Sequence, residues 1–307
     1  MAFALTNDKV TELLRPGRLR ARVSPPMLSE DGREPLSCLS LGWIHVIGTI
    51  AKASLASKFE SLAMGNEEVD TLVQLLKHQP RVPAGTDIVY GEQSAGYSTL
   101  LLTGVACSYR RSESGTRQIY SFQYPGDFCD LYRYLLQEWD ETLAVQALSE
   151  CSTATILHSE MKQLLMQHPR LRLALWRATV LEASILRQWL SNSRKGSAVE
   201  RVANLLCEQL VRREAIGITS PVLPLTQVDV ADAASLSIVH VNRIIQILRN
   251  WNVLSKANHA IEVVDRKQLA QIARFDGRYL ERAGTDVEVA LSDRSARDEE
   301  GAAPGEL

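Results

Sequence analysis

The feature that most constrains the fold is a change of pattern near the middle of the chain. Between residues 82 and 157, glycine and proline separate short runs of β-forming residues, such as Asp87–Tyr90 and Gln118–Phe122. From Pro169 to about Asn192, apolar residues instead recur at helical spacing. Regular short strands with Gly and Pro turns are typical of a small antiparallel roll or barrel. The sequence therefore predicts an α+β protein in which an antiparallel β-roll precedes a long helix.

Length and composition indicate more than one domain. The chain has 307 residues, 45% of them hydrophobic, which is enough for a core in each half. Patterning begins directly after Met64, so a natural start at Met64 is an alternative to translation of the whole chain. We expect a poorly ordered extension over 1–65, a β-roll over 66–168, a long helix over 169–193, a helix-rich domain over 194–281 and an acidic disordered tail over 282–307.

The charge distribution indicates a local anionic partner. The net charge is −2, from 34 basic and 36 acidic residues, which excludes a polycation that coats nucleic acid along its whole length. Residues 194–274 carry 11 basic and 7 acidic side chains, whereas residues 275–307 carry 9 acidic and 4 basic ones. A mildly basic folded segment thus precedes an acidic tail. No apolar run is long enough to span a membrane, so we expect no membrane contact.

The sequence predicts neither an enzyme nor a metal or cofactor site. It contains no HExxH, GxSxG or P-loop motif, and no GxGxxG between a strand and a helix. No two of the five cysteines lie closer than 22 positions, which excludes a local CxxC pair and fits reduced thiols in a cytoplasm. We expect Cys107 and Cys129 to be buried thiols rather than a redox sensor. We expect His158 and His168 to be surface or capping residues rather than haem ligands.

The long helix has two apolar stripes and therefore needs two partners. One stripe, with the alternating three- and four-residue steps of a coiled-coil seam, contains Leu171, Ala174, Ala178, Leu181 and Ile185. The other contains Leu173, Trp176, Val180, Ala183 and Leu190. We expect the first stripe to meet a second copy of the chain in a homodimer and the second to meet the chain's own β-roll. The alternative is a helix buried within a single subunit.

Residues 225–251 predict a helix-turn-helix. Thr226 and Asp229 match a capping box at the start of a short helix, Ser235 and Leu236 form a tight turn, and Ser237 caps a second helix. Residues 252–264 then predict the strand, turn and strand of a wing. This arrangement is typical of DNA-binding domains. The candidate DNA-binding residues are Thr226, Gln227, Ser237, Ile238, Val239, His240, Asn242, Arg243 and Gln246.

These motifs resemble a known family. The Ser-x-x-His-Val-Asn-Arg run at 237–243 and the segment 271–280 closely resemble Crp/Fnr-type bacterial transcription regulators. Val-Pro-Ala-Gly at 82–85, Leu-Leu-Leu-Thr-Gly at 100–104 and Tyr-Pro-Gly-Asp-Phe-Cys-Asp-Leu at 124–131 resemble the same family, so that the likeness covers about 66–281. The resemblance implies a cyclic-nucleotide-binding-like sensor domain, a long dimerisation helix and a winged helix-turn-helix domain.

The resemblance also implies roles for individual residues. Ser237 and His240 match positions that touch phosphate, and Arg243 matches the base-contacting arginine of the recognition helix. The chain would then be a cytoplasmic, homodimeric regulator that binds an inverted repeat in double-stranded DNA and acts with RNA polymerase. The alternative is a ligand-binding regulatory subunit that acts on a protein partner without DNA. The basic surplus and the polar face of the second helix favour the regulator.

Two departures from the family pattern affect DNA recognition. Ile238 and Val239 stand where the cyclic-AMP receptor protein has an arginine and a glutamate that contact bases. We therefore expect a different operator, with apolar contacts to thymine methyl groups. Ser235 stands where a turn glycine is common, which carries an energetic cost if its φ angle is positive.

The effector-pocket candidates are Gly126, Asp127, Phe128, Cys129, Asp130, Glu141 and Thr142. Cyclic-nucleotide readers of the family carry a glutamate for the ribose and an arginine for the phosphate. Here that glutamate is absent and the arginine position falls on Glu141, which would repel a phosphate. An iron–sulfur sensor needs about four clustered cysteines near the N-terminus, and only Cys38 lies there. We therefore expect an unknown small-molecule effector other than cyclic AMP.

Overall fold

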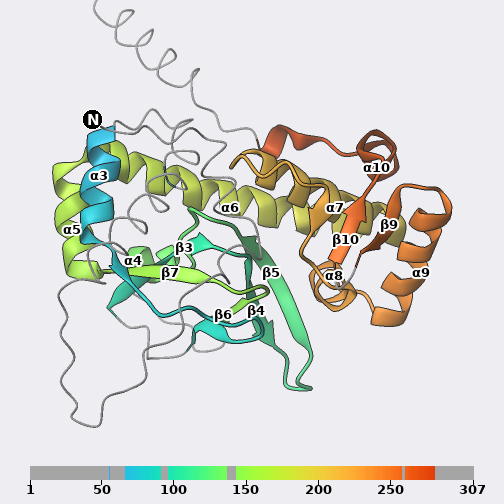
Figure 1. Cartoon of the computed structure of the whole chain (residues 1–307), viewed down its shortest axis with the longest axis horizontal. Coiled ribbons are helices and arrows are strands. Elements are labelled where there is room, and N and C mark those ends of the chain that lie inside the picture. Colours follow the sequence, from blue (N-terminus) through green and yellow to red (C-terminus); the bar gives the residue numbers. More distant parts are fainter. Residues whose placement is uncertain (1–54, 56–65, 91–95, 137–142, 258–259, 281–307) are drawn as a thin grey trace, which may run out of the picture. The chain divides into compact units, whose positions relative to one another are not determined.

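The computed structural model describes residues 55, 66–90, 96–136, 143–257 and 260–280 (Figure 1). The tail expected over 282–307, and all of the extension expected over 1–65 except Leu55, lie outside these residues. Within the described part of the chain, no helix combines the length and hydropathy needed to cross a bilayer.

The N-terminal part is the predicted β-roll, built from two antiparallel sheets. One sheet has the strand order β2–β6–β4–β5 and the other the order β1–β7–β3. The strands are β1 (Lys77–His78), β2 (Asp87–Val89), β3 (Tyr97–Thr103), β4 (Ala106–Arg111), β5 (Arg117–Gln123), β6 (Leu143–Ala147) and β7 (Ser152–Leu157). Three short helices accompany them: α3 (Asn66–Leu75), α4 (Leu131–Leu136) and α5 (His158–Gln167). The α+β fold class expected from the sequence is thus confirmed.

Strands β4 and β5 form a hairpin that turns at Gly115. The Ser112 N–H donates to the Thr116 carbonyl at 2.9 Å, and Gly115 has a φ angle of 81°, which a residue with a side chain adopts only at a cost. Arg111, the last residue of β4, pairs with Arg117, the first residue of β5. The hairpin therefore presents two arginines at its end, of which Arg111 is exposed and Arg117 is largely buried.

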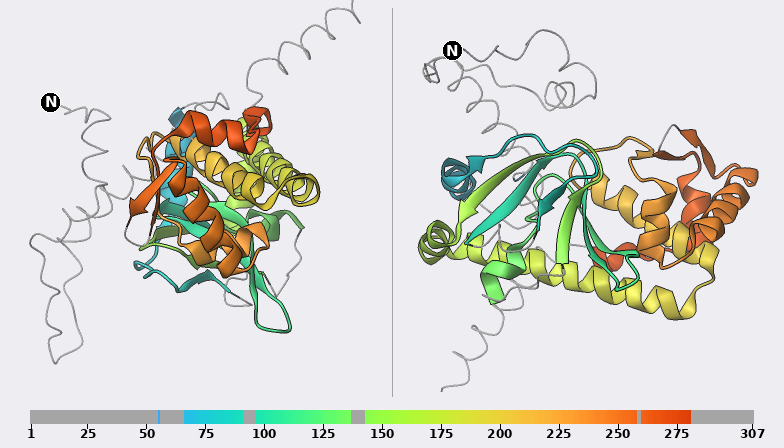
Figure 2. Two further views of the ribbon diagram at one scale, coloured as in Figure 1. Left: turned by 90° about the vertical axis from the view of Figure 1, so that its right-hand side faces the viewer. Right: turned by 90° about the horizontal axis from the view of Figure 1, so that it is seen from below.

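Helix α6 (Pro169–Lys195) begins with proline at its first turn and runs along the β-roll (Figure 2). The stripe that we expected to form the dimer seam faces inward instead. Leu171, Ala174 and Ile185 are buried within their own chain. Ala178 and Leu181 of the same stripe are half-buried and line a cavity beside β5. The assignment of this stripe to a second subunit was therefore wrong.

The opposite stripe of α6 is the exposed one. Its large apolar side chains, with Leu186 beside them, lie open on the surface: Leu173, Trp176, Val180, Leu186 and Leu190. The sequence predicted two apolar faces correctly, but heptad spacing cannot tell which face covers the β-roll. The inward stripe contains the smaller residues Ala174 and Ala178.

The C-terminal part is a winged helical domain with its own three-stranded sheet, of order β8–β10–β9. Its elements are α7 (Ala198–Glu214), β8 (Val222–Leu223), α8 (Gln227–Ala234), α9 (Ile238–Asn250), β9 (Leu254–Ala257), β10 (Ala260–Val263), α10 (Arg266–Ala273) and the 3₁₀ turn η4 (Gly277–Leu280). A capping box opens α7, because the Ser197 hydroxyl accepts from Glu200 N–H and the Glu200 carboxylate accepts from Ser197 N–H. Strands β9 and β10 form the predicted wing.

A buried carboxylate of this part connects α7 and η4 to the long helix α6. Glu208 of α7 is fully buried and accepts hydrogen bonds from Trp189 Nε1 of α6 at 2.9 Å and from the Tyr279 hydroxyl of η4 at 2.8 Å. Burial raises the pKa of Glu208, while nearby Arg212 opposes that shift. Tyr279 belongs to the segment 271–280, which resembles the Crp/Fnr family. Its bond to Glu208 places this segment where α6 and α7 meet.

Candidate functional site

The helix-turn-helix is built from α8, a tight turn and α9. The Thr226 hydroxyl accepts from Asp229 N–H at 3.2 Å, and Asp229 Oδ2 accepts from Thr226 N–H at 2.8 Å, which is the predicted capping box. Ser237 caps α9, since its hydroxyl accepts from His240 N–H at 3.2 Å. Both helix starts are therefore fixed by side chains close in sequence, which is why the sequence predicted them.

The turn between the helices passes through Ser235 in a left-handed conformation, with φ 53° and ψ 48°. A side chain in this region costs roughly 1–2 kcal/mol. We expect Ser235→Gly to raise the free energy of unfolding by about 0.5–1 kcal/mol, because glycine removes this strain but gains entropy in the unfolded state. Urea unfolding measures the change. A loss of stability would contradict the assignment of strain to this residue.

Helix α9 has one buried and one exposed face. The buried face packs into the core of the domain through Val241, Ile244, Ile245 and Leu248. The seven candidate DNA-binding residues from Ser237 to Gln246 all lie exposed on the other face, while Thr226 is exposed and Gln227 half-buried at the start of α8. Ile238 and Val239 are each more than half exposed, although they are apolar. This face combines hydroxyl, imidazole, amide and guanidinium groups with two exposed aliphatic side chains.

One residue of this face was missed from the sequence. Ile247 is exposed and lines a shallow groove together with Ile238, Val239, Asn242, Arg243 and Gln246. It lies four residues after Arg243, one turn further along α9. Helical spacing from Arg243 predicts this position on the exposed face, although its side chain is apolar.

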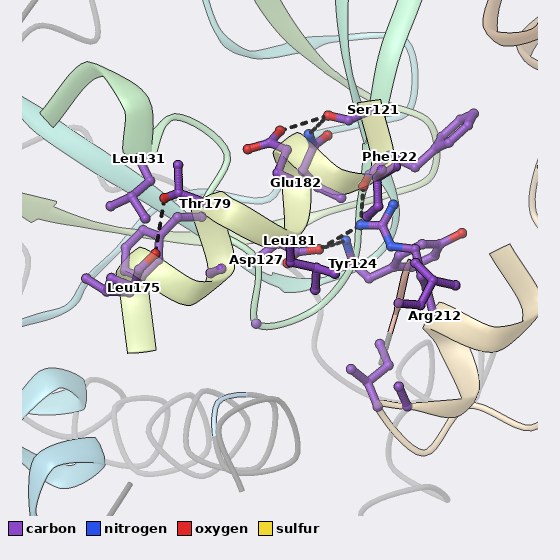
Figure 3. Close-up of a pocket in the computed structure, with 18 of the residues that line it drawn as sticks. Ser121, Phe122, Tyr124, Asp127, Leu131, Leu175, Thr179, Leu181, Glu182 and Arg212 are labelled. Carbon is purple, nitrogen blue, oxygen red and sulfur yellow. Dashed lines mark hydrogen bonds and ion pairs between the residues drawn. The ribbon is translucent and has the colours of Figure 1, made fainter. Parts of the chain in front are cut away.

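The β-roll contributes a second candidate site, a cavity of about 100 Å³ between β5, α6 and α7 (Figure 3). Arg212 projects into it from α7, where its guanidinium donates to the Phe122 carbonyl at 2.7 Å and lies 3.5 Å from the Asp127 carboxylate. On the opposite side, the Ser121 hydroxyl donates to Glu182 at 3.2 Å. The cavity therefore carries charges of both signs and opens beside the helix that joins the two parts of the chain.

The effector-pocket candidates are only partly gathered here. Gly126, Asp127 and Phe128 line the cavity. Cys129 and Asp130 are buried and do not line this cavity, so their place in an effector pocket stays a prediction. Asp130 accepts from the Thr99 N–H at 2.7 Å and so serves the structure of the roll. Glu141 and Thr142 lie outside the described residues.

The described cysteines are buried thiols. Burial raises the pKa of Cys107 and of Cys207 to about 12, and that of Cys151 to about 11. Cys129 is buried as well. Such thiols stay protonated near neutral pH, which is the opposite of the low thiol pKa that a reactive cysteine needs. Within the described ranges, no group of three or more His, Cys, Asp or Glu side chains is placed to hold a metal ion.

Comparisons with known proteins agree with this geometry. The model of a Crp-like helix-turn-helix domain matches residues 200–272. The transcriptional activator protein FnrL of Cereibacter sphaeroides is 25% identical over 232 residues, which cover 74% of this chain and 88% of FnrL. The transcriptional activator protein Anr of Pseudomonas protegens is 23% identical over 224 residues, which cover 72% of this chain and 90% of Anr.

Solved structures have the same fold. FixK2 from Bradyrhizobium japonicum superposes with a TM-score of 0.55 at 23% identity, covering 64% of this chain and 96% of FixK2. A transcriptional regulator of the crp/fnr family from Eubacterium rectale superposes with a TM-score of 0.52 at 16% identity, covering 69% of this chain and 95% of that protein. These likenesses extend over the β-roll, the long helix and the helix-turn-helix together.

Proposed function

The chain belongs to the Crp/Fnr family of DNA-binding transcription regulators, and from that premise we propose that it binds an inverted-repeat operator as a homodimer. The observation that carries the proposal is the exposed face of α9, whose polar side chains suit phosphates and base edges. A two-fold dimer presents two such helices to successive major grooves, so the half-sites lie roughly 34 Å apart.

The side chains of α9 have different roles in this proposal. Arg243 contacts a guanine, because its planar fork matches the two acceptors on the major-groove edge of that base. Ser237 and His240 lie at the start of the helix and contact phosphate oxygens, which fixes the position of the helix without selecting a sequence. Ile238 and Val239 contact thymine methyl groups, a use that accounts for two of the three exposed aliphatic side chains on this face.

The second subunit covers the exposed stripe of α6. Trp176 is 66% exposed and Val180 is 48% exposed, and both lie on the same side of one long helix. Large apolar side chains in a row on a surface helix are typical of a helix–helix interface. The dimer therefore forms through this stripe.

The effector is a small polar molecule bound in the cavity beside β5. A cavity of about 100 Å³ is well below the roughly 300–1,000 Å³ of sites for drug-sized ligands, so it favours a compact effector over a cyclic nucleotide. Arg212 and Glu182 supply opposite charges for such a ligand. Micromolar cyclic AMP is expected to leave the melting temperature unchanged, because only a ligand that binds the folded state raises it.

We expect the bound dimer to activate transcription by contacting RNA polymerase, as the names of the activators FnrL and Anr suggest for this family. Transcription in vitro from a promoter that carries the operator measures this directly. Repression of that promoter would contradict activation but not DNA binding.

Arg243→Ala tests the proposed base contact. We expect it to weaken binding to an operator selected from random duplexes by about 1–3 kcal/mol per half-site, and to reduce discrimination at one base pair of each half-site. Binding to a scrambled duplex should hardly change. The measurement is a titration of both duplexes at one fixed salt concentration, because affinity for DNA depends steeply on salt.

Ser237→Ala is the matched variant for a phosphate contact, and it should weaken binding to both duplexes alike. If Arg243→Ala lowers both affinities equally, Arg243 is a phosphate contact. If the unaltered protein binds no duplex in a salt-dependent manner, the alternative of a regulatory subunit that acts on a protein partner replaces the proposal.

A further inference from the structure

Besides a shared hydrophobic core, the β-roll and the helix-turn-helix are joined by one largely buried arginine. Arg117, at the end of the β4–β5 hairpin, donates from Nη2 to Asp229 at 2.5 Å and from Nε to Asp232 at 2.7 Å. Its remaining nitrogen, Nη1, donates to Gln146 of β6 at 2.7 Å. All three nitrogens of the guanidinium are thus engaged. We call Arg117, Asp229 and Asp232 the clasp.

The clasp is shielded from water. The side chains of Arg117, Asp229 and Asp232 are 13%, 8% and 14% exposed, respectively. Ion pairs on open surfaces contribute little because water screens them, whereas charge-assisted hydrogen bonds that are shielded from water are stronger and hold a defined geometry. β5 and α8 lie next to each other at this point (Figure 1).

Both carboxylates of the clasp belong to α8, and α9 follows α8 directly after the turn at Ser235. Asp229 uses one carboxylate oxygen to cap α8 and the other to bind Arg117, so that the start of the helix and its attachment share one side chain. The direct covalent route from the long helix α6 to the domain passes through Gly196 and Ser197. Such a short joint lets a domain pivot unless other contacts hold it.

We infer that Arg117 is a positioning residue for DNA recognition: by binding Asp229 and Asp232 it fixes the direction in which α9 presents its DNA-binding face. The candidate residues of that face are exposed while the clasp is closed, as contact with DNA requires. The inference rests on the proposed function. In the dimer, Arg117 of the β-roll thereby sets the separation of the two α9 helices.

The test compares the full-length protein with its Arg117→Ala variant on three operators that differ by one base pair in half-site spacing. We expect Arg117→Ala to lower affinity for the best spacing about tenfold, the effect of losing about 1.4 kcal/mol of charged hydrogen bonding. Affinity for the two shifted spacings should fall less, so that preference for spacing shrinks. Binding to a scrambled duplex should not change, because Arg117 does not contact phosphate in this arrangement.

Three further single variants and one double variant make the result specific. Arg111→Ala, in the paired position across the hairpin, removes an exposed arginine and should keep the spacing preference. Asp232→Asn should reproduce the loss, and its combination with Arg117→Ala should add little, as expected for two partners of one interaction. Arg117→Lys keeps the charge but not the fork and should give an intermediate loss, and it carries the test if Arg117→Ala does not fold.

The outcomes separate this inference from the proposed function. An unchanged spacing preference would reduce the clasp to a purely structural role and overturn the inference. Tighter binding by Arg117→Ala would mean that the clasp restrains the domain, which is the opposite of what we infer. An equal loss on every duplex would make Arg117 a phosphate contact. A protein that prefers no operator over a scrambled duplex, before any substitution, would instead overturn the proposed function.

Discussion

The variant with both Trp176 and Val180 replaced by aspartate is expected to be a monomer. Both side chains lie on the exposed stripe of α6, so the substitutions leave the subunit core intact but place four carboxylates in the interface of a dimer. Unpaired charges in such an interface are strongly destabilising. Sedimentation velocity should show half the mass of the unaltered protein.

Loss of the dimer should also weaken operator binding by about 10²–10⁴-fold, because each monomer then engages one half-site without the effective concentration supplied by its partner. Met166→Asp, which charges an exposed apolar residue of α5 outside the stripe, is the control and should remain dimeric. If the doubly substituted protein still sediments as a dimer, the interface lies on another surface.

Substitutions in the inward stripe of α6, which the heptad pattern predicts as the dimer interface, should give a different result in the same experiment. The corresponding variant of the inward stripe combines Leu181→Asp with Ile185→Asp, and Ile185 is buried against its own chain. We now expect this pair to lower the melting temperature rather than to yield a folded monomer. The comparison of the two double variants therefore distinguishes the inward stripe from the outward one.

The features that the sequence could predict are those fixed by residues close together in the chain. The capping pairs at Ser197 and Thr226, and the cap at Ser237, involve residues three positions apart, and their side chains fix where each helix starts. The turn at Gly115 is similarly local. For the same reason the helix-turn-helix and the strands of the roll were predictable from residue types and spacing alone.

Contacts between distant residues were not predictable in this way. Arg117 lies 112 and 115 positions from its two partners, and nothing in the pattern around it distinguishes it from Arg111. Glu208 likewise looks like an ordinary helix-surface glutamate until Trp189 and Tyr279 surround it. Such pairs depend on how finished elements pack, and they decide which polar residues are buried.

Asp130 is the clearest case of a residue whose role changed between sequence and structure. The family motif suggested a place in the effector pocket, yet the side chain is fully buried and receives hydrogen bonds from the backbone and hydroxyl of Thr99. Burial raises the pKa of this carboxyl to about 7, even though the Thr99 bonds and the charge of Arg133 oppose the shift. Asp130 is thus a buried acid that holds its proton in the folded protein up to nearly neutral pH.

This shift predicts a pH-dependent stability that Asp130→Asn removes. The folded protein binds the proton more tightly than the unfolded chain, whose aspartate has a pKa of about 3.9. The resulting stabilisation is complete below pH 4, falls as the pH rises toward 7 and is absent above that. A shift of about three units corresponds to roughly 4 kcal/mol. Asparagine does not titrate, but it keeps an oxygen that accepts from the Thr99 N–H.

The unfolding free energy of Asp130→Asn, measured relative to that of the unaltered protein, should therefore rise by about 4 kcal/mol between pH 4 and pH 8. Urea unfolding of both proteins at intervals across this range measures the difference and cancels the other titrating groups, because those are common to both. Glu113→Gln, which neutralises an exposed carboxylate in the β4–β5 turn, is the control and should give a nearly constant difference. If the Asp130→Asn difference is equally constant, Asp130 is already ionised at low pH and its burial is offset by Thr99 and Arg133.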